Sequence, residues 1–165
     1  MTALARLDAF LSPGRTPAAS LLRAVRAGLA LAAVAVGLGF ALLLAFPPRE
    51  LPNAGLDTST ASGLVAVLLR APVVETALLA VAYKAVSDLT NNNGPLPCLF
   101  IAAAAAWLHP HTGATMLVPA VSFAAMAWQY GRYDDQLGFV GAFVGVALTH
   151  FTLNATVLSL AALLP

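Results

Sequence analysis

The chain contains 165 residues, of which 60% are hydrophobic and only 9% are charged. Because soluble domains carry roughly 25% charged residues, this composition predicts several membrane-spanning helices and leaves no length for a soluble catalytic domain. The formal net charge of +1 offers no basic surface for nucleic acid, and the single cysteine, Cys98, excludes an intrachain disulfide.

The N-terminal segment differs from the rest of the chain. Residues 1–22 combine arginines with apolar residues at helical spacing, which predicts a short interfacial helix ending at the Ser-Pro-Gly of residues 12–14. We assign residues 23–165 to a single transmembrane helical domain. Its first span, residues 27–46, carries no charge. This run is longer than the ~7–15-residue apolar region of a signal peptide, so we expect a retained helix.

The charges on either side of this first span predict its orientation in a cell membrane. Arg23 and Arg26 precede the span, whereas the loop after it, with Arg49, Glu50 and Asp57, is net acidic. Basic residues are enriched on the cytoplasmic side of membrane proteins. We therefore expect a multi-pass protein whose N-terminus lies in the cytoplasm.

Four further apolar runs follow. Pro72 lies inside the first of them and predicts a kink, because proline has no backbone N–H. A polar turn is expected at residues 131–135, before the last run. The fold class is therefore all-α: a polytopic membrane protein with a bundle of about five to six transmembrane helices. The four runs cover residues 62–86, 96–109, 114–129 and 137–164.

Four polar residues interrupt these runs: Glu75, His109, His150 and Asn154. Polar residues inside a membrane are costly and are functional candidates by default. Counted from the polar breaks on one face, Glu75, His109 and His150 lie at nearly the same depth, ~18–20 Å. His150 and Asn154 are four residues apart and share one helical face. The sequence thus predicts that a carboxylate, two imidazoles and an amide meet in one pocket.

These residue types suit peptide hydrolysis, which needs a base for a water molecule and a donor for the oxyanion. We assign Glu75 as the general base, with His109 or His150 keeping it ionised. Asn154 either orients His150 or donates to the oxyanion. No cofactor is required in this preferred mechanism. The alternative is a divalent metal such as zinc held by Glu75, His109 and His150.

Each of these residues also has a structural explanation. Glu75 could pair with Arg70 or Lys84, and His109 could be an interfacial histidine near the end of a span. His150 and Asn154 could serve only as hydrogen bonds between helices.

The order of the polar residues resembles the family of CAAX-processing and bacteriocin-processing (CPBP/Abi-type) intramembrane proteases, over about residues 70–160. His150-Phe151-Thr152-Leu153-Asn154 matches the family's His-x-x-x-Asn motif, and Trp107-Leu108-His109 follows an apolar run as the second motif does. Departures are found at three positions, where the family has a second glutamate, an arginine and a phenylalanine. They are Thr76, Ala80 and Ala105.

A second alignment of the histidine motif is open. It places Trp107 at the phenylalanine position and His111 at the histidine position. We prefer His109 because its depth matches that of Glu75 and His150.

Three functions are compared. The resemblance implies an intramembrane endopeptidase, a hydrolase acting on a membrane-associated or lipid-modified peptide. Loss of the second glutamate and the arginine favours a degenerate membrane scaffold or assembly factor of the same fold. A small proton-coupled carrier is the third, although no internal repeat supports it. Expected partners are membrane lipid and a membrane-bound peptide or protein substrate; membership of a larger membrane complex is left open.

Overall fold

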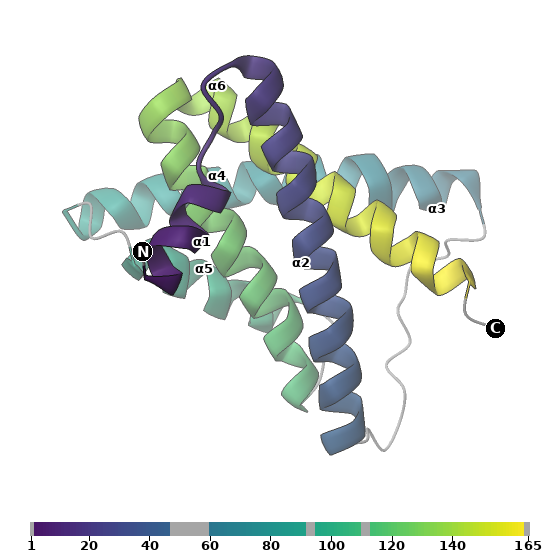
Figure 1. Cartoon of the computed structure of the whole chain (residues 1–165). Coiled ribbons are helices and arrows are strands. Elements are labelled where there is room, and N and C mark those ends of the chain that lie inside the picture. The colour runs from purple at the N-terminus through teal and green to yellow at the C-terminus, as the bar shows by residue number, and fades with distance from the viewer. Residues whose placement is uncertain (1, 47–59, 92–94, 110–112, 164–165) are drawn as a thin grey trace.

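The computed structural model describes residues 2–46, 60–91, 95–109 and 113–163 (Figure 1). The elements in these ranges are all helical, which agrees with the expected all-α class. Two of them are short irregular turns: a π-helical turn, η1, and a 3-10 turn, η2. In chain order the elements are α1 (Ala3–Leu11), α2 (Pro17–Ala45), α3 (Ala61–Val65), η1 (Ala66–Arg70), α4 (Ala71–Leu89), α5 (Pro95–Leu108), η2 (Gly113–Met116) and α6 (Leu117–Leu163).

Three helical stretches of the described chain are long and apolar enough to cross a membrane: Pro17–Ala45, Ala61–Leu89 and Ala114–Leu163. Pro95–Leu108 is a shorter apolar helix. This arrangement is compatible with a multi-pass membrane protein. The expectation of about five to six spans was too high, chiefly because two of the predicted spans form parts of one long helix.

That long helix, α6, bends at Gly138, where φ is 71° and ψ is 178°. The polar turn expected at residues 131–135 is helical instead, and the break comes later, at the glycine. Contacts with other helices explain why residues 131–135 stay helical. Tyr133 is buried and its hydroxyl donates to the Ser20 carbonyl at 3.0 Å, while Gly131 lies against the Tyr83 ring. A positive φ is accessible to glycine without a Cβ clash, so the chain turns there.

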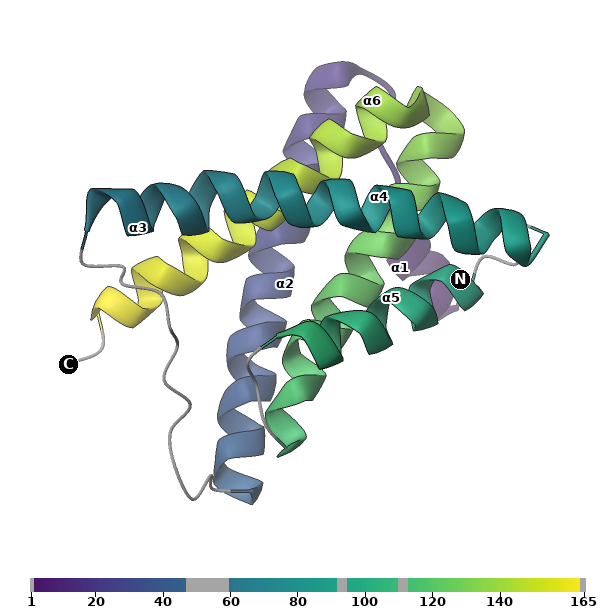
Figure 2. The ribbon, with the colours of Figure 1, turned by 180° about the vertical axis from the view of Figure 1, so that it is seen from behind.

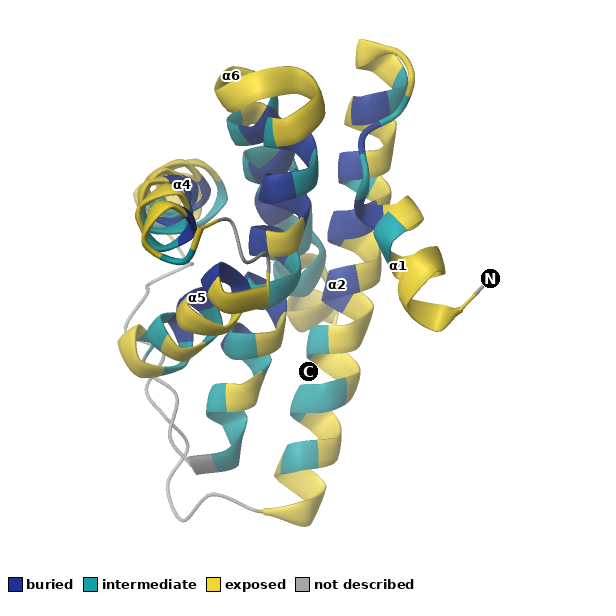
Figure 3. Cartoon of the chain, turned by 90° about the vertical axis from the view of Figure 1, so that its left-hand side faces the viewer, coloured by how far each residue is buried: buried dark blue, intermediate teal, exposed yellow. Residues whose placement is uncertain are grey.

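Buried residues of α2 face α6 (Figure 3), and the main cluster of buried apolar residues joins α6 to α4 and α5. Small residues on α2, including Ala24 and Gly28, allow a close approach; a Cβ on Gly28 would overlap the Thr149 carbonyl. The Thr149 hydroxyl donates to the Ala24 carbonyl at 3.0 Å. Small residues and such interhelical hydrogen bonds are typical of membrane helix packing.

The N-terminal segment forms a helix that ends near the predicted position, while its place at a membrane interface stays a prediction. Helix α1 ends at Leu11, and Ser12 caps it through the Asp8 carbonyl. Arg23 of α2 donates to carbonyls at the end of α1, which holds the helix against its neighbour. The loop charges used to predict membrane orientation lie outside the described residues, so that orientation remains a prediction.

Helix α4 lies crosswise to α2 rather than alongside it (Figure 2). The figure also shows α5, below α4, beside the part of α6 that precedes Gly138, which is called the first leg of α6 below. Helices α4, α5 and α6 all contact one another; Glu75 lies on α4, His109 directly follows the last residue of α5, and His150 lies on α6.

Candidate functional site

Glu75 lies on α4, one turn after an irregular part of the helix. A π-helical turn covers Ala66–Arg70, and Pro72 follows directly. Pro72 cannot donate a backbone hydrogen bond, and π-turns inside α-helices are frequent at functional sites. Pro72 was predicted to kink the helix; the structure shows a π-helical turn before the proline, within a helical stretch that continues from Ala61 to Leu89.

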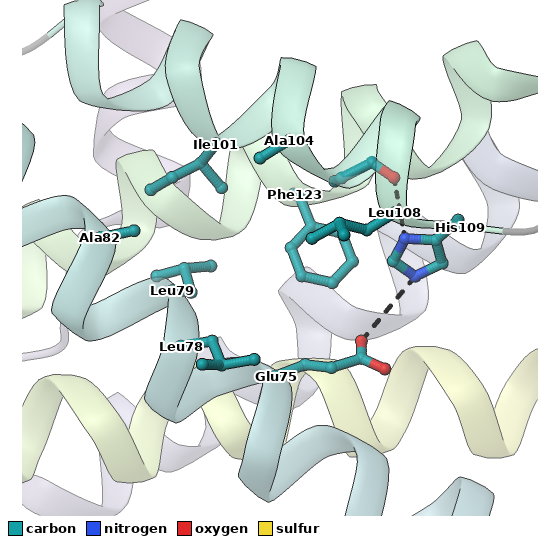
Figure 4. Close-up of a pocket in the computed structure, with 10 residues that line it drawn as sticks. Glu75, Leu78, Leu79, Ala82, Ile101, Ala104, Leu108, His109 and Phe123 are labelled. Atoms are coloured by element: carbon teal, nitrogen blue, oxygen red, sulfur yellow. Dashed lines mark hydrogen bonds and ion pairs between the residues drawn. The ribbon is translucent and has the colours of Figure 1, made fainter.

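The Glu75 carboxylate faces both histidines with the same oxygen, Oε2. That atom lies 3.5 Å from His150 Nε2 and 3.9 Å from His109 Nε2 (Figure 4 shows Glu75 and His109). A carboxylate on α4, an imidazole just after α5 and an imidazole on α6 thus lie close together, as predicted, while the roles assigned to them stay predictions. Among the described lysines and arginines, none lies within ion-pair distance of Glu75. Lys84, one of the two structural partners considered for it, pairs with Asp134 instead.

The orientation of His109 is determined by its own helix. Its Nδ1 lies 2.9 Å from the Ala105 carbonyl, which can only accept, so Nδ1 carries the proton. In the neutral ring Nε2 is then an acceptor that faces Glu75 Oε2, itself an acceptor. Two acceptors separated by 3.9 Å are suited to one bridging water that donates to both.

His150 is the most enclosed of the three groups, with 5% of its side chain exposed against 32% for Glu75. Its Nδ1 is buried and has no hydrogen-bond partner within the described chain. Its Nε2 points to Glu75 and is the atom through which it acts on the site.

Phe123 of α6 was not singled out from the sequence, yet it separates the two histidines. Its ring centroid lies 5.2 Å from that of His109 and 5.4 Å from that of His150. Both distances are typical of packed aromatic pairs. No local signal distinguishes this phenylalanine from others that only pack.

Asn154 is placed beside the site but does not bond to His150 in this structure. Its Nδ2 donates to the backbone carbonyl of Val67, in the π-turn, at 3.0 Å. Of the two roles predicted for Asn154, direct orientation of His150 is therefore not what the structure shows. Donation to an oxyanion is not tested.

Two cavities meet at this cluster, and both are lined in part by His109 and Phe123. The first, of about 410 Å³, is otherwise almost entirely aliphatic and runs between α4 and α5. Glu75 and His109 lie at one end of it, and Ala82 and Ile101 at the other (Figure 4). The second, of about 290 Å³, contains His150 and Asn154.

The three positions that depart from the family pattern are all buried: Thr76 and Ala80 are each 1% exposed, and Ala105 is 5% exposed. A glutamate or arginine side chain at Thr76 or Ala80 would have to displace neighbours in the core. The alternative histidine, His111, lies outside the described residues, so the structure does not compare it with His109.

The residue types of the cluster are those of a three-ligand zinc site. However, the described residues contain no group of three or more His, Cys, Asp or Glu side chains placed to hold one metal ion. The metal alternative therefore stays a prediction, and we derive no step through a metal.

The comparisons with known proteins add no relative: no family model, curated protein or solved structure matches the chain. Any assignment therefore depends on the short motifs and on the geometry of the cluster.

Proposed function

We propose that this protein is an intramembrane endopeptidase of the CAAX-processing and bacteriocin-processing type, which hydrolyses a membrane-associated or lipid-modified peptide. One observation carries the proposal. A carboxylate oxygen on α4 faces the imidazole nitrogen of His109, just after α5, at 3.9 Å and that of His150, on α6, at 3.5 Å, at the end of an apolar cavity. Ionisable groups inside membrane helices mark reaction or transport sites more often than structural ones.

The chemistry follows from the hydrogen-bonding roles of the groups. A water between His109 Nε2 and Glu75 Oε2 donates to both, and Glu75 accepts one proton as the water attacks the peptide carbonyl. The Glu75 carboxyl then returns that proton to the leaving amine. His150 with a proton on Nε2, and the Asn154 amide, are the donors near the developing oxyanion. Atoms balance as one water consumed for one peptide bond broken.

The larger cavity supports an apolar substrate. Its lining beyond Glu75 and His109 is aliphatic or aromatic, so a lipid chain or a hydrophobic peptide side chain would lie there without leaving polar atoms unpaired. A scissile bond next to that anchor would reach the Glu75 end of the cavity. Membrane lipid and a membrane-bound peptide or protein are the partners this site implies, in a multi-pass cell-membrane protein with a cytoplasmic N-terminus.

A second candidate is a non-catalytic scaffold or assembly factor with the same fold. It is favoured by Thr76 and Ala80, which stand where the family has a glutamate and an arginine. Both are buried among apolar neighbours. In that case the cluster would stabilise helix packing, and the membrane partner would be a protein complex rather than a substrate.

A cleavage assay separates the two candidates. Purified protein in detergent is mixed with a farnesylated fluorogenic peptide and, in parallel, with the same peptide lacking the farnesyl group. We expect hydrolysis by the wild type and none by Glu75→Ala, while Asp88→Asn, an exposed carboxylate of the same helix, stays active. Equal rates for wild type and Glu75→Ala would remove the enzymatic proposal and leave the scaffold.

The metal alternative has its own measurement. Elemental analysis of the same purified sample is compared with hydrolysis before and after treatment with a chelator. Stoichiometric zinc, and activity lost with it, would replace the carboxylate mechanism by a metal-activated water.

A further inference from the structure

The hydrogen bonds of the π-turn leave one backbone carbonyl without its usual partner. In a regular α-helix the Val67 carbonyl would accept from the N–H of residue 71. Here the Ala71 N–H donates to Ala66 instead, as a π-turn requires. A π-type hydrogen bond to the Val67 carbonyl would have to come from the N–H of residue 72.

Residue 72 is proline and has no N–H. Neither the α-type nor the π-type bond is therefore available to the Val67 carbonyl, inside an apolar helix where an unpaired carbonyl is costly. The Asn154 Nδ2 donates to this carbonyl at 3.0 Å. A side chain from α6 thus replaces the hydrogen that Pro72 lacks.

This bond and the catalytic contact join the same two helices. Val67 lies two turns before Glu75 on the α3–η1–α4 stretch, and Asn154 lies one turn after His150 on α6. We propose that Asn154 is a positioning residue: by donating to Val67 it fixes the π-turn against α6 and thereby sets the separation of Glu75 from His150. The importance of that separation for hydrolysis rests on the proposed function; the hydrogen bond itself does not.

The proposal explains why the polar amide and the proline occur together. Asn154 is needed because residue 72 cannot donate, so an alanine at position 72 should make Asn154 dispensable for holding the π-turn. This reciprocity distinguishes a specific replacement of one hydrogen from a general contribution of Asn154 to packing.

Amide hydrogen exchange in detergent micelles tests the pair. Exchange is followed by mass spectrometry in a peptide covering residues 64–76 for the wild type, Asn154→Leu, Pro72→Ala and the double variant. We expect exchange about tenfold faster in Asn154→Leu, the scale of a buried carbonyl that loses its donor, and a return to within about twofold of wild type in the double variant. Ser159→Ala, which removes a hydrogen bond internal to α6, is the matched control and should leave this peptide unchanged.

A second measurement reports on Glu75 itself. Dicyclohexylcarbodiimide, an apolar reagent that modifies carboxyl groups in membranes, is added to the same four proteins, and the rate of Glu75 modification is measured across pH. The pH profile should shift in Asn154→Leu and return to that of the wild type in the double variant. A variant that only loosened packing would not be restored by an alanine at position 72.

The proposal is overturned if the double variant exchanges as fast as Asn154→Leu, or if Asn154→Leu matches the wild type. Should Asn154→Leu fail to fold, Asn154→Ser, whose side chain is too short to reach Val67, takes its place with the same expected results. Neither amide exchange nor carbodiimide modification requires a substrate. Absence of hydrolysis would therefore count against the proposed function alone, and absence of rescue against the positioning role alone.

Discussion

Two groups of ionisable side chains, each with members on α6, are built in opposite ways. At one end of the first leg of α6, Arg132 holds Asp8 of α1 through two contacts, Nε to Oδ1 at 2.9 Å and a donation from Nη2 to Oδ2 at 3.0 Å. The Trp128 indole N–H also donates to Asp8, and Lys84 pairs with Asp134 at 3.2 Å. Each of these carboxylates has a basic partner at hydrogen-bond distance.

Among the described residues, the cluster of Glu75, His109 and His150 contains no lysine or arginine paired with the carboxylate. Its carboxylate faces only imidazoles, at separations longer than a direct hydrogen bond, and the buried His150 Nδ1 has no partner within the described chain. A paired carboxylate is a stable end point, because its charge is already balanced and its lone pairs are occupied. A carboxylate held next to titratable rings and a cavity can still take a proton. The paired carboxylates stabilise the packing of the helices, whereas the Glu75 carboxylate remains able to take part in proton transfer.

The difference between the two groups is tested most directly by replacing a carboxylate of each group with its amide. Glu75→Gln keeps the size of the side chain but removes the base, so hydrolysis of the farnesylated peptide should fall by at least ~10³-fold. Asp134→Asn removes a charge from the paired group and should leave the rate within about twofold. The measurement is the initial rate at saturating peptide. A similar loss in both variants would mean that the two groups do not differ in role.

His150→Gln should have the next largest effect on the rate. The amide of a glutamine is not held at the position of the His150 Nε2–H, so the oxyanion loses a preorganised donor, and we expect a loss of about 10²-fold in the same assay. Thr156→Val on the same helix removes a hydrogen bond internal to α6 and serves as control. Full activity of His150→Gln would exclude the ring as the oxyanion donor and reduce it to a packing residue.

Asp8→Asn should affect stability rather than hydrolysis. It weakens a two-contact ion pair that joins α1 to α6, at a site where both side chains are partly exposed. We expect a loss of ~1 kcal/mol in unfolding free energy, seen as a fall in Tm of a few degrees in detergent, with the hydrolysis rate retained. A rate that fell in parallel with Glu75→Gln would instead connect α1 to the site.

Lys84→Gln should show the smallest change. Its ammonium pairs with Asp134, but the lysine side chain is 55% exposed, and such pairs contribute at most a few tenths of a kcal/mol. Thermal unfolding in low and high salt should give curves that differ little from those of the wild type. A large, salt-dependent loss would show that this pair lies in a less polar setting than its exposure indicates.

The composition and the polar residues were informative because a membrane penalises polarity locally. Glu75, His109 and His150 stood out as single residues in apolar runs, and their joining across three helices was expected from depth alone. The number of spans was not predicted correctly. Whether residues 131–135 turn or stay helical depends on Tyr133 reaching Ser20 and on Gly131 admitting the Tyr83 ring, contacts between segments far apart in the chain.

The residues that surround the site also could not be predicted from the sequence, because their contacts join different helices. Phe123 is one aromatic among several on apolar helices, and only the packed structure places it between the two histidine rings. Pro72 predicted a kink, but not that the freed Val67 carbonyl would be satisfied by Asn154 from another helix.

By itself, the amino-acid sequence determined that this is a helical protein suited to a membrane, and which few polar side chains are candidates for chemistry. Both follow from local composition, because the cost of placing each residue in an apolar medium does not depend on its distant neighbours. Only the tertiary structure decided where α6 bends, which oxygen of Glu75 meets the histidines, and which carbonyl Asn154 holds. These outcomes depend on contacts between helices, whose directions and rotations are set by packing and not by the pattern within any one segment.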